Sequence, residues 1–172
     1  MKPILTILGV VVALIVIVLV IGAMLPKEHT ARVRTVLHAP PESVYAAITD
    51  VEHAPAWRTG LKKVEVLERD PLRWRETAEW GTLTFVHDNA VPPSRVVARI
   101  ADESQGFGGT WTYEIAPAPD GSAVTITENG TVSNPLFRFL TKFVLGHYSS
   151  LETYARDLAK RSGDTSEPER IN

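Results

Sequence analysis

The stretch Pro135–Arg161, which reads PLFRFLTKFVLGHYSSLETYARDLAKR, predicts one long amphipathic helix. Large side chains, most of them apolar, recur at steps of three and four residues, which places them on one face of a helix. This stripe consists of Leu136, Leu140, Phe143, Val144, His147, Leu151, Tyr154 and Leu158. Burying its apolar members would contribute on the order of 10 kcal/mol, so we expect the helix to pack against the preceding strands.

The ends of this stretch carry the residues expected at helix boundaries. Asn134 is the predicted N-cap, Pro135 suits the first helical position, and Gly163 suits a left-handed terminator just beyond Arg161. In the middle, Gly146 costs about 1 kcal/mol relative to alanine and marks a bend or a close backbone approach. The pattern still predicts a single helix.

The N-terminal stretch Ile4–Leu25 is apolar apart from Thr6 and two glycines. About 22 residues at 1.5 Å each extend about 33 Å as a helix, enough to cross a bilayer core. We therefore expect a single-pass transmembrane anchor over residues 1–26. A cleaved signal peptide is the alternative, but its apolar region is normally about 7 to 15 residues, and no small-x-small cleavage site follows here.

The side of the membrane on which the rest of the chain lies is left open. Lys2 precedes the apolar stretch, whereas Lys27, Arg32 and Arg34 follow it, so the positive-inside rule favours a cytoplasmic C-terminal domain. Arg32 and Arg34 also fit a folded strand, where they would not count as flanking charges.

The remaining chain divides into a short linker, one domain and a tail. Residues 27–31 form the expected linker, residues 32–161 are long enough for one domain with its own core, and residues 162–172 are polar enough to be disordered. The linker extends at most about 20 Å, so the domain stays close to the lipid surface.

Composition excludes several classes of function. With no cysteine among its 172 residues, the chain has no disulfide, thiolate metal site or cysteine nucleophile. A formal net charge of -2 argues against binding to nucleic acid. The neighbouring His87, Asp88 and Asn89 do not predict a metal site, because successive strand residues point to opposite faces. We expect no metal and no cofactor.

Between the anchor and the last helix, the pattern is that of strands with two short helical segments. Ala31–His38 alternates and predicts a first strand, after which Pro40 and Pro41 start a short helix that ends near Asp50. A brief helical turn follows around Pro55. From Gly60 to Ser133 the period is two, which predicts an antiparallel meander and an α+β fold with six or seven strands.

This order of elements resembles the helix-grip fold of the START, polyketide-cyclase and pollen-allergen-like superfamily, abbreviated SRPBCC. The local match runs from Val33 to Trp57, where a strand leads into APPESVY at residues 39–45 and on to Ala56-Trp57. The resemblance implies a sheet curled around the C-terminal helix, with a cavity between them for a lipid, a polyketide or another apolar molecule.

The residues expected to line that cavity come from the inward faces of the strands and from the last helix. They are Trp74, Phe85, His87, Trp111, Tyr113, Ile126, Glu128, Phe143, His147 and Leu151. Trp80 is expected on the same face as Trp74. Aromatic, concave surfaces with a few polar groups are typical of apolar ligand pockets, and an ordinary filled core is the alternative.

Three functions follow from this pattern. The first is a membrane-anchored binder of a lipid or another apolar small molecule, with the bilayer and that molecule as its partners and no catalytic residue. The second is a cyclase, aromatase or dehydratase in which Glu128 and His147 transfer protons. The third is a module with a closed core that helps to assemble a membrane complex; its protein partners stay open.

Overall fold

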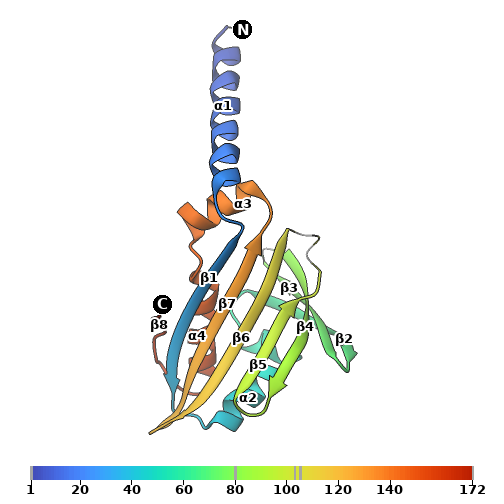
Figure 1. Ribbon diagram of the computed structural model, residues 1–172, viewed down its shortest axis with the longest axis vertical. Helices are drawn as coiled ribbons and strands as arrows, with labels where there is room; N and C mark the ends of the chain where they lie inside the picture. Colours follow the sequence, from blue (N-terminus) through green and yellow to red (C-terminus); the bar gives the residue numbers. More distant parts are fainter. Residues whose placement is uncertain (1, 80, 103, 105, 172) are drawn as a thin grey trace.

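The computed structural model describes residues 2–79, 81–102, 104 and 106–171. Trp80, which the sequence pattern places on the same face as Trp74, lies outside the described residues. Helix α1, Lys2–Met24, stands apart from the rest of the chain, as Figure 1 shows. It is apolar, it is not buried inside the protein, and at 1.5 Å per residue its 23 residues extend about 35 Å. By length and composition α1 is a candidate membrane anchor, and a signal sequence has the same properties.

The domain is built on one curved antiparallel sheet in the order β2-β3-β4-β5-β6-β7-β1-β8. The strands are β1 Glu28–Leu37, β2 Leu61–Arg69, β3 Leu72–Ala78, β4 Gly81–Val91, β5 Arg95–Ile100, β6 Phe107–Ala118, β7 Gly121–Val132 and β8 Glu169–Arg170. Strands β2 to β7 pair in chain order, as the predicted meander requires, and β1 adds to β7. Because β1 begins at Glu28, most of the stretch expected to be a linker, residues 27–31, is instead strand.

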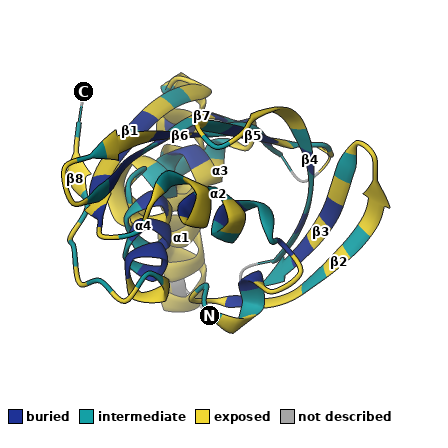
Figure 2. Ribbon diagram, turned by 90° about the horizontal axis from the view of Figure 1, so that it is seen from below, coloured by how far each residue is buried: buried dark blue, intermediate teal, exposed yellow. Residues whose placement is uncertain are grey.

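Three helical segments lie on the concave side of the sheet. These are α2 Pro41–Thr49, the 3-10 turn η1 Ala54–Ala56 and α4 Ser149–Arg161. Figure 1 places α2 at the end of the sheet far from α1, and Figure 2 shows buried positions of α4 turned toward the strands. Leu151, Ala155 and Leu158 of α4 are fully buried in the core, where they join Val33 of β1 and Ile126 of β7. This arrangement is the helix-grip fold that the sequence predicts.

The predicted single helix is divided, and this is the main correction to the sequence analysis. Its first part is α3, Pro135–Leu140, followed by the π-helical turn η2, Thr141–Leu145. Gly146 then adopts φ 76° and ψ 155°, which ends the helix, because a residue with a side chain rarely takes that conformation. The expected N-cap is confirmed, since the Asn134 side chain accepts a hydrogen bond from the Leu136 N–H at 2.9 Å.

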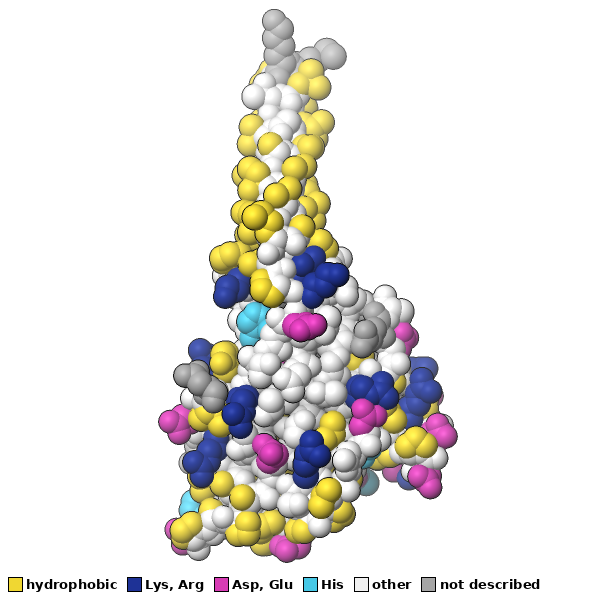
Figure 3. Space-filling model, in the orientation of Figure 1, with side chains coloured by type: hydrophobic (Ala, Val, Ile, Leu, Met, Phe, Trp, Pro, Cys, Tyr) yellow, Lys and Arg dark blue, Asp and Glu magenta, His cyan; other side chains and the backbone are white. Residues whose placement is uncertain are grey.

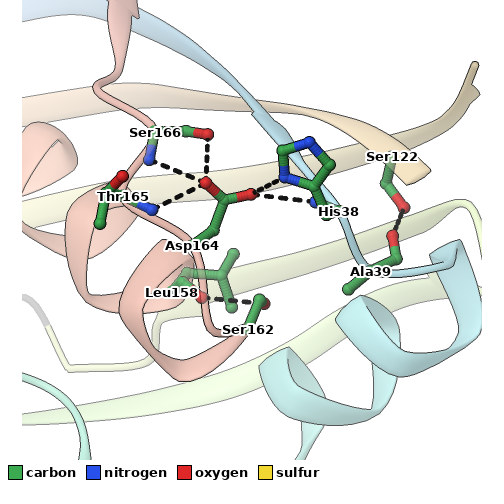
Figure 4. A network of polar contacts seen from close by, with 8 residues as sticks. All are labelled: His38, Ala39, Ser122, Leu158, Ser162, Asp164, Thr165 and Ser166. Carbon is green, nitrogen blue, oxygen red and sulfur yellow. Dashed lines mark hydrogen bonds and ion pairs between the residues drawn. The ribbon is translucent and has the colours of Figure 1, made fainter. Parts of the chain in front are cut away.

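The tail was expected to be disordered, and the structure instead places it along the outer edge of the sheet. Glu169–Arg170 pair with β1, and Figure 4 shows how the Asp164 carboxylate fastens the preceding turn. Asp164 accepts hydrogen bonds from the His38 backbone N–H at 3.0 Å and from the Ser166 hydroxyl at 2.7 Å, and its Oδ2 lies 2.6 Å from His38 Nδ1. These hydrogen bonds lower the pKa of Asp164. Polar composition alone did not reveal them.

A candidate ligand site between the sheet and α4

A cavity of about 660 Å³ lies between the concave face of the sheet and α4. Its walls come from strands β3 to β7, from the segment around η1, from α4 and from the end of η2. This volume is within the range of small-molecule pockets, about 300–1,000 Å³. The space between sheet and helix is therefore not completely filled by side chains.

Most residues that the sequence analysis proposed for this site lie on the cavity wall. These are Trp74, Phe85, His87, Trp111, Tyr113, Glu128 and His147. The rings of Trp74 and Phe85 are stacked with centroids 5.6 Å apart, and His87 meets the edge of Trp74 at 4.8 Å. Burial lowers the pKa of His87, so its imidazole is neutral at pH 7.

The other three proposed residues lie elsewhere. Ile126 and Leu151 are fully buried in the core and do not reach the cavity. Phe143 is 60% exposed, because the break at Gly146 turns the segment that carries it away from the sheet. Helical periodicity placed Phe143 and Leu151 on one face, and that argument holds only while the helix is continuous.

One part of the cavity wall is polar, although it is largely removed from solvent, with the side chains of Arg58 and Glu76 24% and 11% exposed. Arg58 Nη1 lies 2.6 Å from Glu76 Oε1, and the Trp74 indole N–H donates to the same oxygen at 3.0 Å. The guanidinium of Arg58 also stands 5.1 Å from the centre of the Tyr154 ring. Burial opposes the charged form of Arg58, but the Glu76 carboxylate and the neighbouring Tyr154 and Tyr113 together outweigh burial and raise the pKa of Arg58. The ion pair thus keeps both charges inside the domain.

Two tyrosines lie beside this ion pair. The rings of Tyr113 and Tyr154 are 5.3 Å apart and their hydroxyl groups are hydrogen bonded to each other. Burial raises the pKa of both phenols, that of Tyr154 to about 12. Both therefore stay protonated near neutral pH, where they offer hydrogen bonds to a ligand and do not act as bases.

The end of the cavity nearest α1 holds an imidazole pair and a carboxylate. The rings of His29 and His147 are 4.2 Å apart, and His29 Nε2 lies 3.7 Å from Glu128 Oε1. Gly130 makes room for this pair, because a Cβ there would overlap with the His29 ring. Burial, and then the neighbouring His29, lower the pKa of His147, whose buried Nδ1 has no hydrogen-bond partner.

Several residues of the wall were not proposed from the sequence. His29 lies in the stretch assigned to the linker, and Arg58 follows an irregular turn where periodicity gives no facing. Tyr154 was assigned to the helix stripe but not to the cavity. Phe137 of α3 also lies on the wall, with its ring 5.1 Å from that of Phe107. Among the described residues, no three His, Cys, Asp or Glu side chains converge on a metal-sized site.

A curved antiparallel sheet that holds a helix across an apolar cavity defines a helix-grip domain. The model of the polyketide cyclase / dehydrase and lipid transport family matches residues 28–160. The chain therefore belongs to that family. Its description covers both enzymes and lipid carriers, so membership alone does not choose between them.

Solved structures share this fold at low sequence identity. A START superfamily protein from Mycobacterium smegmatis is 18% identical, with a TM-score of 0.61 over 79% of this chain and 97% of that chain. A conserved protein from Geobacillus kaustophilus is 14% identical, with a TM-score of 0.67 over 82% and 99%.

The di-domain ARO/CYC StfQ from the steffimycin biosynthetic pathway is 14% identical, with a TM-score of 0.61. The match covers 80% of this chain and only 52% of StfQ, about half its length. Among curated proteins, no sequence matches.

Proposed function

We propose that this protein is a membrane-anchored binder of a lipid or another apolar small molecule, held in the cavity between the sheet and α4. The observation that carries the proposal is a cavity of about 660 Å³ walled by Trp74, Phe85 and Trp111. Large aromatic surfaces favour apolar ligands, and the tyrosines and the Arg58–Glu76 pair offer a few fixed polar contacts for orientation.

The way α1 joins the domain supports placing the cavity beside a bilayer. A Cβ at Gly22 of α1 would overlap with the carbonyl of Pro135, so glycine permits close packing of α1 on α3. Arg138 Nη1 donates to the carbonyls of Ala23 at 3.4 Å and Leu25 at 2.7 Å, which satisfies groups at the C-terminal end of α1. These contacts fix α3 at the end of the candidate anchor, as Figure 1 shows.

Apolar side chains next to that junction face outward. Phe143, Val144 and Leu145 are 60%, 67% and 63% exposed. In a protein anchored by α1, whose surface is apolar (Figure 3), a bilayer surface would cover them, because they follow α3, which packs against the end of α1. Leu145 also lines the cavity together with Phe137, so the lipid-facing segment forms part of the cavity wall. An apolar ligand would then pass between membrane and cavity without crossing water.

A second candidate function is proton-transfer catalysis of the cyclase or dehydratase type. The observation that favours it is the group of Glu128, His29 and His147 on the cavity wall. Glu128 faces His29, whose other neighbour is His147. A proton that moves between the pair proposed from sequence, Glu128 and His147, would therefore have to pass through His29. For this function, Glu128→Gln abolishes turnover and leaves ligand binding unchanged, whereas equal loss of both excludes a catalytic role.

The binding function is tested by filling the cavity. Ala98 of β5 lines the cavity beside Trp111, its paired residue on β6. Ala98→Phe would therefore occupy volume that the ligand needs. Thr112→Phe is the matched control, because Thr112 is absent from the cavity wall while its strand neighbours Trp111 and Tyr113 both belong to it.

Native mass spectrometry of the full-length protein incubated with oleate measures the bound fraction. We expect one oleate on the wild type and on Thr112→Phe, and at least a tenfold loss on Ala98→Phe, with circular dichroism confirming that both variants fold. No adduct on the wild type, or equal adducts on both variants, would contradict the proposal.

A further inference from the structure

A second pocket, of about 240 Å³, lies where α1 meets the domain. It is bounded by the residues that follow α1, the start of β1, the end of β7, and α3 with η2. Three cationic side chains line it, Lys27, Arg138 and Lys142, against one carboxylate, Glu28. Figure 3 shows basic side chains gathered directly beneath the apolar surface of α1. The pocket is therefore positively charged and sits where the anchor ends.

Arg138 is the unusual member of this group. It is only 8% exposed, and it makes no ion pair with any carboxylate among the described residues. Its guanidinium donates to backbone carbonyls at the end of α1 and to that of Ser133, while its buried Nε has no hydrogen-bond partner. A buried cation without a countercharge is costly, and an anion in the pocket would offset that cost.

The rest of the pocket wall includes an imidazole nitrogen that also lacks a hydrogen-bond partner. His147 lines this pocket, and its buried Nδ1 lacks a partner. Lys27 and Lys142 likewise have no carboxylate within ion-pair distance in the described part of the chain, and Lys142 is exposed. Two separate observations, the orphaned Arg138 Nε and the orphaned His147 Nδ1, thus point to a missing polar ligand.

The charged pocket and the apolar cavity share a wall. His29 and His147 line both, so a group held by Lys27 and Arg138 lies next to the end of the large cavity. An amphiphile with a phosphate at one end and an acyl chain at the other matches this pair of compartments. The cations bind phosphate through charge-assisted hydrogen bonds, and the aromatic cavity takes the chain.

From these observations we infer that the pocket formed by Lys27, Arg138 and Lys142 binds the phosphate group of a membrane phospholipid whose acyl chain enters the large cavity. The inference rests on the proposed lipid-binding function and names the ligand class. A lipid phosphate is favoured over free phosphate because the pocket lies at the end of the apolar helix and opens beside a large cavity with aromatic walls that suits an acyl chain.

The test compares three probes on the full-length protein by native mass spectrometry: phosphatidylglycerol, a diacylglycerol with the same chains, and inorganic phosphate as competitor. We expect one bound phosphatidylglycerol, at least tenfold weaker retention of diacylglycerol, and little displacement by phosphate at equal concentration. A lost charge-assisted hydrogen bond, about 1.5 to 3 kcal/mol, corresponds to roughly a tenfold or greater loss in affinity.

Lys142→Gln is the main variant, because Lys142 is exposed and its replacement leaves the fold intact; Arg138→Gln also removes contacts that hold α1 to α3. We expect both to weaken phosphatidylglycerol binding roughly tenfold and to leave diacylglycerol binding unchanged. Lys160→Gln, an exposed lysine of α4 outside both pockets, is the control and should change neither.

The outcomes separate this inference from the proposed function. Equal retention of phosphatidylglycerol and diacylglycerol, unaffected by Lys142→Gln, would overturn the phosphate site while the apolar cavity still binds lipid. Efficient displacement by inorganic phosphate would show a free-anion site and overturn the lipid assignment. Binding of neither lipid would overturn the proposed function itself.

Discussion

The two halves of the stretch Pro135–Arg161 have similar sequence patterns and opposite environments. In α4, the apolar stripe is buried against the sheet, with Leu151 and Leu158 fully inaccessible. In η2, Phe143, Val144 and Leu145 are all more than half exposed. Gly146 separates the halves with a backbone conformation that breaks the helix.

This difference shows that hydrophobic periodicity identifies an apolar face but not the partner that covers it. The sheet covers the face of α4. For η2 and α3, the neighbouring element is α1, fixed there by the Arg138 hydrogen bonds and by the close approach of Gly22 to Pro135. In our account the bilayer covers the exposed part, so one half of the stretch belongs to the core and the other to the membrane surface.

The largest expected contrast is in stability. Leu151→Ala removes a fully buried side chain of α4 and should lower the free energy of unfolding by about 2 to 5 kcal/mol. Phe143→Ala, in the exposed half, should change it by less than about 0.5 kcal/mol. Urea unfolding of the full-length protein in a mild detergent measures both. A loss of several kcal/mol for Phe143→Ala would show that η2 packs into the domain.

The next largest effect on stability is expected at Gly146, the break between the two halves. Gly146→Ala meets no neighbouring atom, so its cost comes only from the backbone conformation, about 1 to 3 kcal/mol. Gly9→Ala in α1 also meets open space but has no positive φ, and it serves as the control that leaves the domain unfolding midpoint unchanged. If Gly146→Ala were as stable as the wild type, the two halves would form one helix after all.

The smallest effect concerns pH at the junction, where His147 follows Gly146. Its folded pKa is lowered, chiefly by burial and then by His29, so the unfolded chain binds a proton more readily. Stability should therefore fall as pH drops below about 6.5 and level off below the folded pKa. His147→Gln should flatten this dependence, and unfolding midpoints between pH 5 and 8 measure it.

His53 is a control, because its effect on the pH dependence of stability has the opposite sign. Its hydrogen bond to Asp50 raises its pKa, so its contribution is complete below about 6.5 and is lost as pH rises through the folded pKa. His53→Gln should remove a contribution to stability that increases as the pH falls. A His147→Gln variant with the pH profile of the wild type would show that the junction imidazole is not buried.

The sequence predicted the fold where local patterns are sufficient. Alternation from Gly60 to Ser133 identified the meander, and Asn134 and Gly163 identified helix boundaries, because each of these signals depends on the residue and its neighbours. It did not predict the partition of the last helix, because glycine tolerates a helix interior as well as a break. The tail was missed because the Asp164 contacts join segments far apart in the sequence.

The candidate site was predictable in part for the same reason. Strand alternation placed Trp74, Phe85 and Trp111 on the cavity wall, where inward and outward residues follow from the period alone. His29 and Arg58 were missed, since the first lies where a strand was not expected to start and the second follows an irregular turn. Their positions depend on tertiary packing, which no local pattern records.

The central claim is that the segment before Gly146 lies in the bilayer surface while α4 lies in the domain. Because the chain has no cysteine, Val144→Cys and Arg156→Cys each give a single labelling site on the full-length protein in lipid vesicles. We predict that a fluorophore at position 144 is quenched by lipids carrying a quencher in their acyl chains, and that one at position 156 is quenched only by aqueous iodide. Quenching of both positions by iodide alone would contradict the account.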